Sequence, residues 1–141
     1  MLYIRVFTKA ITVSASALAL FVGCFVVAGS ASAAEGAGDA AAGKTAYGRC
    51  AACHSITPGR NGVGPSLFGV VGRKAGSLEG FKYSDAMVES DVIWSTSTLD
   101  SHLADVKGFI PGNRMGIFYP AGVANADDRA NIIAYLETLT E

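Results

Sequence analysis

The chain has 141 residues, which is enough for one small domain and a leader segment. Its 11 lysine and arginine residues nearly balance 12 aspartate and glutamate residues, and the net charge of −1 argues against nucleic-acid binding. Half of the residues are hydrophobic, but the first thirty inflate that fraction, and the remainder is too short for a large aliphatic core. A bound apolar group would supply the missing core volume.

The first 33 residues have the pattern of an export signal. Its parts are a positively charged start, an uncharged apolar run and a small-residue cleavage site: Arg5, Lys9, residues 10–29 and Ala31-Ser32-Ala33. We therefore expect residues 1–33 to be a signal peptide and residues 34–141 to be the functional domain, located in the periplasm. Without the leader, nine basic and twelve acidic residues remain, which gives a net charge of about −3.

The apolar run is long for a signal peptide and nearly long enough to span a bilayer. If it is retained, it would anchor the protein to the inner membrane, with the domain facing the periplasm. Membrane contact is expected only in that case. Cys24 lies inside the run and is interpreted as an inert residue, because Phe25-Val26-Val27 after it does not fit an acylation site.

An alanine-rich helix is expected to begin near Asp39, whose carboxylate suits the positive end of the helix dipole. Gly43, Tyr47, Cys50 and His54 follow at intervals of four, three and four residues, so they share one helical face. A glycine inside a helix costs about 1 kcal/mol relative to alanine. Close crossing by a second helix is the usual compensation, so this face should be buried.

The pentapeptide Cys50-Ala51-Ala52-Cys53-His54 is the attachment signature of a c-type haem. On one to two turns of helix, both thiols can reach the two vinyl groups of one porphyrin edge, and His54 then reaches the iron. A redox dithiol would need a βαβ pattern, and a zinc site would need a second pair of ligands. The chain has one further histidine, His102, so neither alternative is favoured.

Residues 57–64 form a predicted loop, and residues 64–76 contain four glycines, which indicates irregular backbone packed near a flat object. Arg73 lies in this otherwise apolar segment and needs an anionic partner. A short helix capped by Ser84 is expected within residues 81–90.

A longer helix is expected over residues 97–106, with Lys107-Gly108 closing it as a C-cap. The last helix begins at Asn125, a good N-cap. Its predicted inner face should pack against the helix that carries Gly43: Ile132, Tyr135, Leu136 and Leu139. Because no stretch alternates with a period of two, we expect an all-α domain.

Taken together, the chain resembles class I cytochrome c over about residues 38–140. The matching segments occur in the family's order: Cys50-Ala51-Ala52-Cys53-His54, Gly64-Pro65, Gly72-Arg73, Phe81-Lys82-Tyr83-Ser84-Asp85-Ala86, Trp94, Ile110-Pro111-Gly112-Asn113-Arg114-Met115 and Ile133-Ala134-Tyr135-Leu136. The resemblance implies a cytochrome c fold, in which three to five helices and irregular loops surround one covalently attached haem.

The resemblance also implies ligands for the haem iron. One haem c would be bound through Cys50 and Cys53, with His54 and Met115 as the two protein ligands of the iron. A soft, neutral thioether stabilises ferrous iron and raises the reduction potential. The carbonyl of Pro65 is the expected acceptor for the second ring nitrogen of His54.

Further residues take roles from the same resemblance. Arg73, Tyr83 and Trp94 would hold the buried haem propionate. Asn113 stands where the family has a hydroxyl near the ligand loop, and it is counted with the cofactor-binding residues. His102 replaces a tyrosine that bonds the methionine sulfur in the family; an imidazole can donate the same bond or compete for iron.

The implied function is one-electron transfer, with no catalysis. The expected partners are respiratory or photosynthetic membrane complexes such as quinol–cytochrome c oxidoreductase and a terminal oxidase or photosynthetic reaction centre. A monomer is expected, with Arg49, Lys107 and Arg114 forming a basic rim around the haem edge. The alternative is a haem enzyme or gas-binding sensor in which Met115 is a labile ligand.

Overall fold

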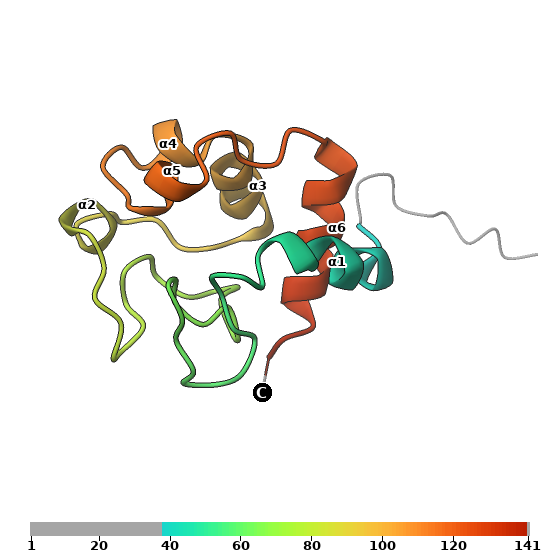
Figure 1. Ribbon diagram of the computed structural model, residues 1–141, viewed down its shortest axis with the longest axis horizontal. Helices are drawn as coiled ribbons and strands as arrows, with labels where there is room; N and C mark the ends of the chain where they lie inside the picture. Colours follow the sequence, from blue (N-terminus) through green and yellow to red (C-terminus); the bar gives the residue numbers. More distant parts are fainter. Residues whose placement is uncertain (1–37, 141) are drawn as a thin grey trace, which may run out of the picture. The chain divides into compact units, whose positions relative to one another are not determined.

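The computed structural model of the chain describes residues 38–140 (Figure 1). Within this range the chain is all-α, as predicted, with six α-helices and one 3₁₀ turn. This exceeds the expected three to five helices because three of the six are single turns of four residues each. The elements in chain order are α1 (Ala40–Ala46), η1 (Tyr47–Arg49), α2 (Asp85–Val88), α3 (Thr96–Ala104), α4 (Val106–Phe109), α5 (Met115–Phe118) and α6 (Ala126–Glu137). The predicted signal or anchor over residues 1–33 lies outside the described residues.

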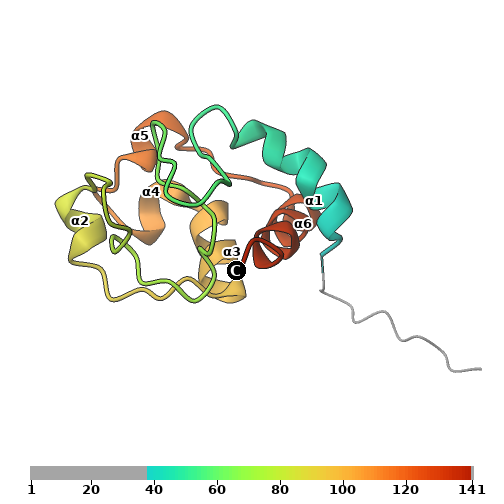
Figure 2. The same ribbon diagram turned by 90° about the horizontal axis from the view of Figure 1, so that it is seen from below.

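Helices α1 and α6 cross closely, as both Figure 1 and Figure 2 show. Gly43 is buried at the crossing, where a side chain would collide with the backbone of Asn131. The amide of Asp39 donates to Asn131 Oδ1 across 2.7 Å, and the Asp39 carboxylate caps α1 by accepting from the amide of Ala41 at 2.7 Å. The predicted pairing of the Gly43 face with the last helix is therefore confirmed, and the absent side chain makes it possible.

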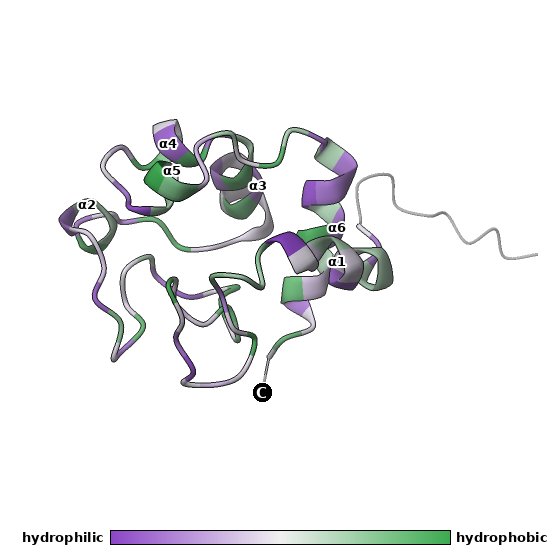
Figure 3. Cartoon of the chain, viewed as in Figure 1, coloured by the Kyte–Doolittle hydropathy of each residue, from purple (hydrophilic) through white to green (hydrophobic). Residues whose placement is uncertain are grey.

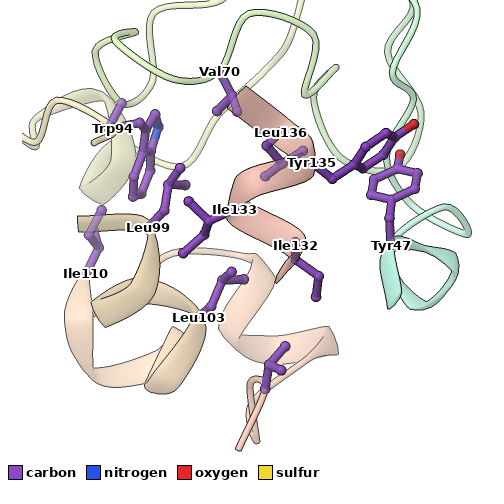
Figure 4. Close-up of a cluster of buried hydrophobic side chains, with 12 residues drawn as sticks. Tyr47, Val70, Trp94, Leu99, Leu103, Ile110, Ile132, Ile133, Tyr135 and Leu136 are labelled. Atoms are coloured by element: carbon purple, nitrogen blue, oxygen red, sulfur yellow. The ribbon is translucent and has the colours of Figure 1, made fainter. Parts of the chain in front are cut away.

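The inner face of α6 forms the centre of the core (Figure 4). Asn125 caps the helix by accepting from the amide of Asp128 at 2.9 Å, as predicted. The ring of Tyr135 lies 5.7 Å from that of Tyr47. Leu139, which the pattern placed on this face, lies beyond the end of α6 and is only partly buried. The buried residues of α6 are Ile132, Ile133, Tyr135 and Leu136.

Helix α3 begins with a capping box that the sequence reading missed. Ser95 Oγ accepts from the amide of Thr98 at 3.2 Å, and Thr98 Oγ1 accepts from the amide of Ser95 at 2.7 Å. The prediction that Lys107-Gly108 closes this helix is wrong, because both residues lie inside α4. Asp105 ends α3, and its carboxylate accepts from the amide of Gly108 at 2.8 Å, which starts a new helical turn.

Between η1 and α2 the chain runs as irregular loops, as the glycine pattern predicted. At Gly76, with a φ of 71°, a side chain would be strained and would also collide with the carbonyl of Met87. Ser84 precedes α2 at the N-cap position, but its side chain makes no capping hydrogen bond. The segment between η1 and α2 is therefore held by contacts with the rest of the domain more than by regular secondary structure.

One helix has an apolar surface that the fold does not cover. Figure 3 shows α5 coloured as strongly hydrophobic, and its Ile117 and Phe118 are 72% and 70% exposed. None of the helices in residues 38–140 is long and apolar enough to cross a membrane.

Candidate functional site

A cavity of about 420 Å³ lies in the described domain, and its walls come from loops and helices far apart in the sequence. Its size lies within the usual range for a bound small molecule or cofactor. Eight of the nine site residues predicted from the sequence line it: Cys50, Cys53, His54, Pro65, Arg73, Tyr83, Trp94 and Met115. Asn113 does not line it.

Cys50 and Cys53 lie half-buried in the cavity wall, and no disulfide joins them. The α-helix ends at Ala46 instead of continuing to His54, and the chain tightens into the 3₁₀ turn and a further turn. That turn is closed by the amides of Cys53 and His54, which donate to the carbonyl of Cys50 at 3.0 and 2.9 Å. Burial raises the pKa of the Cys50 thiol, while the nearby Arg49 lowers it. Both thiols and the histidine are thus brought to one wall.

The imidazole of His54 is held in one tautomer. Its Nδ1 lies 2.8 Å from the carbonyl oxygen of Pro65, and because a carbonyl only accepts, Nδ1 carries the proton. Nε2 therefore keeps its lone pair for a metal ion. Burial lowers the pKa of His54, which favours the neutral ring. The backbone of Gly64 lies against the ring, and a side chain there would collide with it.

Met115 is the first residue of α5 and reaches the cavity from a turn that Asn113 organises. The buried Asn113 Nδ2 donates to the carbonyls of Val106 and Ile110 at 2.6 and 2.7 Å. Asn113 Oδ1 accepts from the amide of Gly116 at 2.8 Å. All three contacts are to backbone, so Asn113 positions the segment that carries Met115 and does not face the cavity.

Arg73, Tyr83 and Trp94 line the cavity together. Arg73 Nη1 and Nη2 donate to the carbonyls of Phe68 and Ser66 at 3.1 and 2.9 Å. Burial lowers the pKa of Arg73 and raises the pKa of Tyr83. Within residues 38–140 no carboxylate pairs with the half-buried guanidinium. An anionic group in the cavity would meet this charge.

His102 is the second histidine of this cavity, and it is buried. The side chain is 6% exposed, and its ring lies 5.1 Å from that of Trp94 and 5.8 Å from that of Phe109. Nδ1 is enclosed and has no hydrogen-bond partner among the described residues. Burial, together with the nearby His54, lowers the pKa of His102 to about 4, so the ring is neutral.

The cavity also contains residues whose position the sequence reading missed. Met87 lines the cavity from α2. Phe118 and Tyr119, both from the segment that follows Met115, line it as well. The periodicity of a single-turn helix is too short to predict which face points inward.

The three basic residues of the predicted rim differ in their surroundings. Arg49 lines the cavity but forms an ion pair of 3.0 Å with Asp128. Arg114 lines the cavity, is exposed, and has no ion pair within residues 38–140. Lys107 is exposed and does not line it. Arg114 is therefore the rim cation that both lines the cavity and has no ion pair within residues 38–140.

Comparison with known proteins agrees with this arrangement. The profile of the family described as Cytochrome c matches residues 40–140. The chain is 56% identical over 94 residues to cytochrome c2 iso-2 of Magnetospirillum fulvum, covering 67% of this chain and 95% of that protein. It is 48% identical over 101 residues to cytochrome c2 of Rhodoblastus acidophilus, covering 71% and 92%. Cytochrome cH from Methylobacterium extorquens superposes with a TM-score of 0.66 at 45% identity, covering 72% and 99%.

The fold and the cavity define a small all-α domain with a cavity large enough for a cofactor. The chain belongs to the cytochrome c family. Members of this family bind haem c covalently and are electron carriers rather than enzymes. The cavity fits such a group, because it offers two thiols, a metal-binding nitrogen, a thioether and a guanidinium that no carboxylate of residues 38–140 pairs with.

Proposed function

We propose that this protein carries single electrons between respiratory or photosynthetic membrane complexes, on a haem c that Cys50 and Cys53 bind covalently. One observation carries the proposal: the cavity collects two free thiols, a histidine with a lone pair on Nε2, and the sulfur of Met115. A bound haem supplies a one-electron iron couple. The chain's own contribution is to attach, orient and enclose it.

His54 and Met115 are the proposed iron ligands. The hydrogen bond from Nδ1 to the Pro65 carbonyl fixes the tautomer and ring orientation of His54. The thioether of Met115 favours the ferrous state and raises the reduction potential. Because both sides of the iron would be occupied, no position remains for a substrate, which suits a carrier.

Arg73, Tyr83 and Trp94 are proposed to hold a haem propionate. The guanidinium is half-buried, its two backbone acceptors leave further N–H groups free, and no carboxylate of the described residues neutralises it. A charged group that is partly desolvated needs a partner of opposite charge. A propionate would supply that partner and satisfy the free donors.

The alternative is a gas-binding sensor with a labile Met115. It is supported by the loose packing of α5, in which Ile117 and Phe118 are largely exposed. The two functions differ in one simple measurement. A carrier should not bind carbon monoxide in its ferrous form at neutral pH, whereas a sensor should bind it at once.

We propose that the protein works in the periplasm, after export directed by residues 1–33 or held by an anchor over residues 10–29. Its proposed partners are a quinol–cytochrome c oxidoreductase and a terminal oxidase or photosynthetic reaction centre. Mass spectrometry of the native protein, with the haem mass included, will show whether the chain begins at Ala34. Reduction and oxidation kinetics with isolated membranes of each type will identify the donor and the acceptor.

Haem attachment is tested with the full chain, expressed in a host that has machinery for c-type haem attachment. We expect Cys50→Ala and Cys53→Ala to lower haem-stained protein on a denaturing gel at least several-fold, because each removes a covalent bond. Cys24→Ala, in residues 1–33, is the matched control and should leave the haem stain unchanged. Normal haem staining of either cysteine variant would overturn the attachment.

A further inference from the structure

His102 is a polar group inside the cavity that the fold leaves without a partner. It is 6% exposed, its Nδ1 is enclosed and unpaired among the described residues, and its nearest rings are those of Trp94 and Phe109. A buried polar atom without a partner costs about 1–3 kcal/mol. Because Nδ1 is enclosed while the ring lines the cavity, Nε2 is the only ring nitrogen that can meet a metal bound there.

The helix that carries His102 is held more firmly than the turn that carries Met115. Helix α3 starts with a capping box and buries Leu99 and Leu103 beside His102. Met115 begins α5, a single turn in which Ile117 and Phe118 are 72% and 70% exposed. Segments with few buried contacts open at a lower free-energy cost than packed helices. Met115 is thus released more easily than His102 is moved.

His102 is also the nitrogen ligand that the cavity offers in place of Met115. Imidazole is a common ligand of iron, whereas a thioether is soft and favours the reduced metal. Residues 108–124 contain neither lysine nor histidine. Lys107 precedes them, but it is exposed and does not line the cavity. Arg114 lines the cavity, but a guanidinium offers no lone pair to a metal.

We propose that His102 is an alternative ligand of the haem iron: when Met115 is released, the His102 imidazole would bind the iron in its place. This inference rests on the proposed function. The exchange breaks one sulfur–iron bond and forms one nitrogen–iron bond, with no change in oxidation state. Because the thioether that raises the potential is then gone, this state has a lower reduction potential and keeps the carrier oxidised until Met115 rebinds.

The test uses the full-length holoprotein of Met115→Ala, observed by visible and electron paramagnetic resonance spectroscopy in the ferric state. We expect a low-spin iron with two axial nitrogen ligands. Met115→Ala/His102→Phe should be high-spin, whereas the matched control Met115→Ala/Lys107→Ala should stay low-spin. A high-spin Met115→Ala protein, or a low-spin state that is lost with Lys107, would overturn the proposal.

A second measurement decides the matter if the His102 double variant yields no holoprotein. The chain has two histidines, so Met115→Ala labelled with ¹⁵N-histidine should show two axial histidine nitrogens in pulsed resonance spectra. One labelled axial nitrogen would overturn the proposal. The two failures are distinct: wild type without haem refutes the proposed function, whereas Met115-ligated wild type with high-spin Met115→Ala refutes this inference alone.

Discussion

The hydroxyl of Tyr47 donates a hydrogen bond of 2.6 Å to the backbone carbonyl of His54. Tyr47 also packs its ring 5.7 Å from that of Tyr135 on α6. The bond therefore connects the crossing of α1 and α6 to the residue that offers its Nε2 to iron. The helix pair acts as the rigid support from which the attachment turn projects.

Tyr47→Phe should lower the free energy of unfolding by about 1 kcal/mol, because the carbonyl of His54 loses its donor. Burial raises the pKa of Tyr47 to about 12, from 10.0 in the unfolded chain. The neutral phenol thus stabilises the fold fully below pH 10, and this contribution is lost as the pH rises from 10 towards 12. Denaturant unfolding should show a smaller difference in unfolding free energy between wild type and Tyr47→Phe at pH 11 than at pH 7. Tyr135→Phe, whose hydroxyl makes no hydrogen bond within residues 38–140, is the control and should lower the free energy of unfolding at pH 7 less than Tyr47→Phe does.

Gly43→Ala should destabilise the protein by about 1–3 kcal/mol, because the new methyl group would collide with the backbone of Asn131 at the helix crossing. The gain in helix propensity, about 1 kcal/mol, offsets only part of that cost. Gly48→Ala is the matched control, since nothing lies within 4 Å of its added methyl group. Equal stability of the two variants would show that the crossing relaxes around a side chain.

Asn113→Ala removes three hydrogen bonds that hold the turn before Met115. We expect a loss of roughly 2–4 kcal/mol in unfolding free energy, from unpaired buried backbone groups. The ferric protein should also bind added imidazole more tightly than wild type, because Met115 is released more easily. Imidazole affinity equal to wild type would confine Asn113 to a purely structural role.

Arg114→Gln should slow electron exchange with the natural partner at low salt, because Arg114 lines the cavity, is exposed and has no ion pair within residues 38–140. Arg49→Gln should have a smaller effect, since Asp128 already compensates that charge at 3.0 Å. Both effects should fade as the Debye length falls to about 8 Å at physiological ionic strength. Stopped-flow rates measured over a series of salt concentrations check the order of the two variants.

Acid stability should depend on His102. Burial lowers its pKa to about 4, against 6.5 in the unfolded chain. Between these values the unfolded chain takes up a proton that the folded chain does not, so stability is complete above pH 6.5 and falls as the pH drops. From pH 7 to pH 4, wild type should lose up to about 3 kcal/mol more than His102→Phe does. If the unfolding free energies of wild type and His102→Phe changed equally with pH, the assignment of a buried, neutral His102 would be contradicted.

The sequence alone determined the features that depend on residue type and short spacing. The pentapeptide from Cys50 to His54 predicted the attachment site because two thiols and an imidazole at fixed intervals serve one chemistry. Asn125 as an N-cap and the inner face of α6 also followed from local rules, which need only a few neighbouring residues.

Local rules failed where a side chain had two possible backbone partners. Lys107-Gly108 reads as a helix end, but the Asp105 carboxylate accepts from the Gly108 amide and starts α4. The family resemblance counted Asn113 with the cofactor-binding residues, yet three backbone groups brought together by the turn engage both of its amide donors and its side-chain oxygen. Such competition depends on which groups the fold places within hydrogen-bonding distance.

The tertiary structure decided which residues share the cavity. Burial of His102, the inward position of Met87, and the pairing of Arg49 but not Arg114 all arise from contacts between segments separated by tens of residues. Residue type and periodicity say little about such contacts, because a single-turn helix or an irregular loop has no repeating face. Packing of α3, α5 and the glycine-rich loops around one cavity fixes those positions.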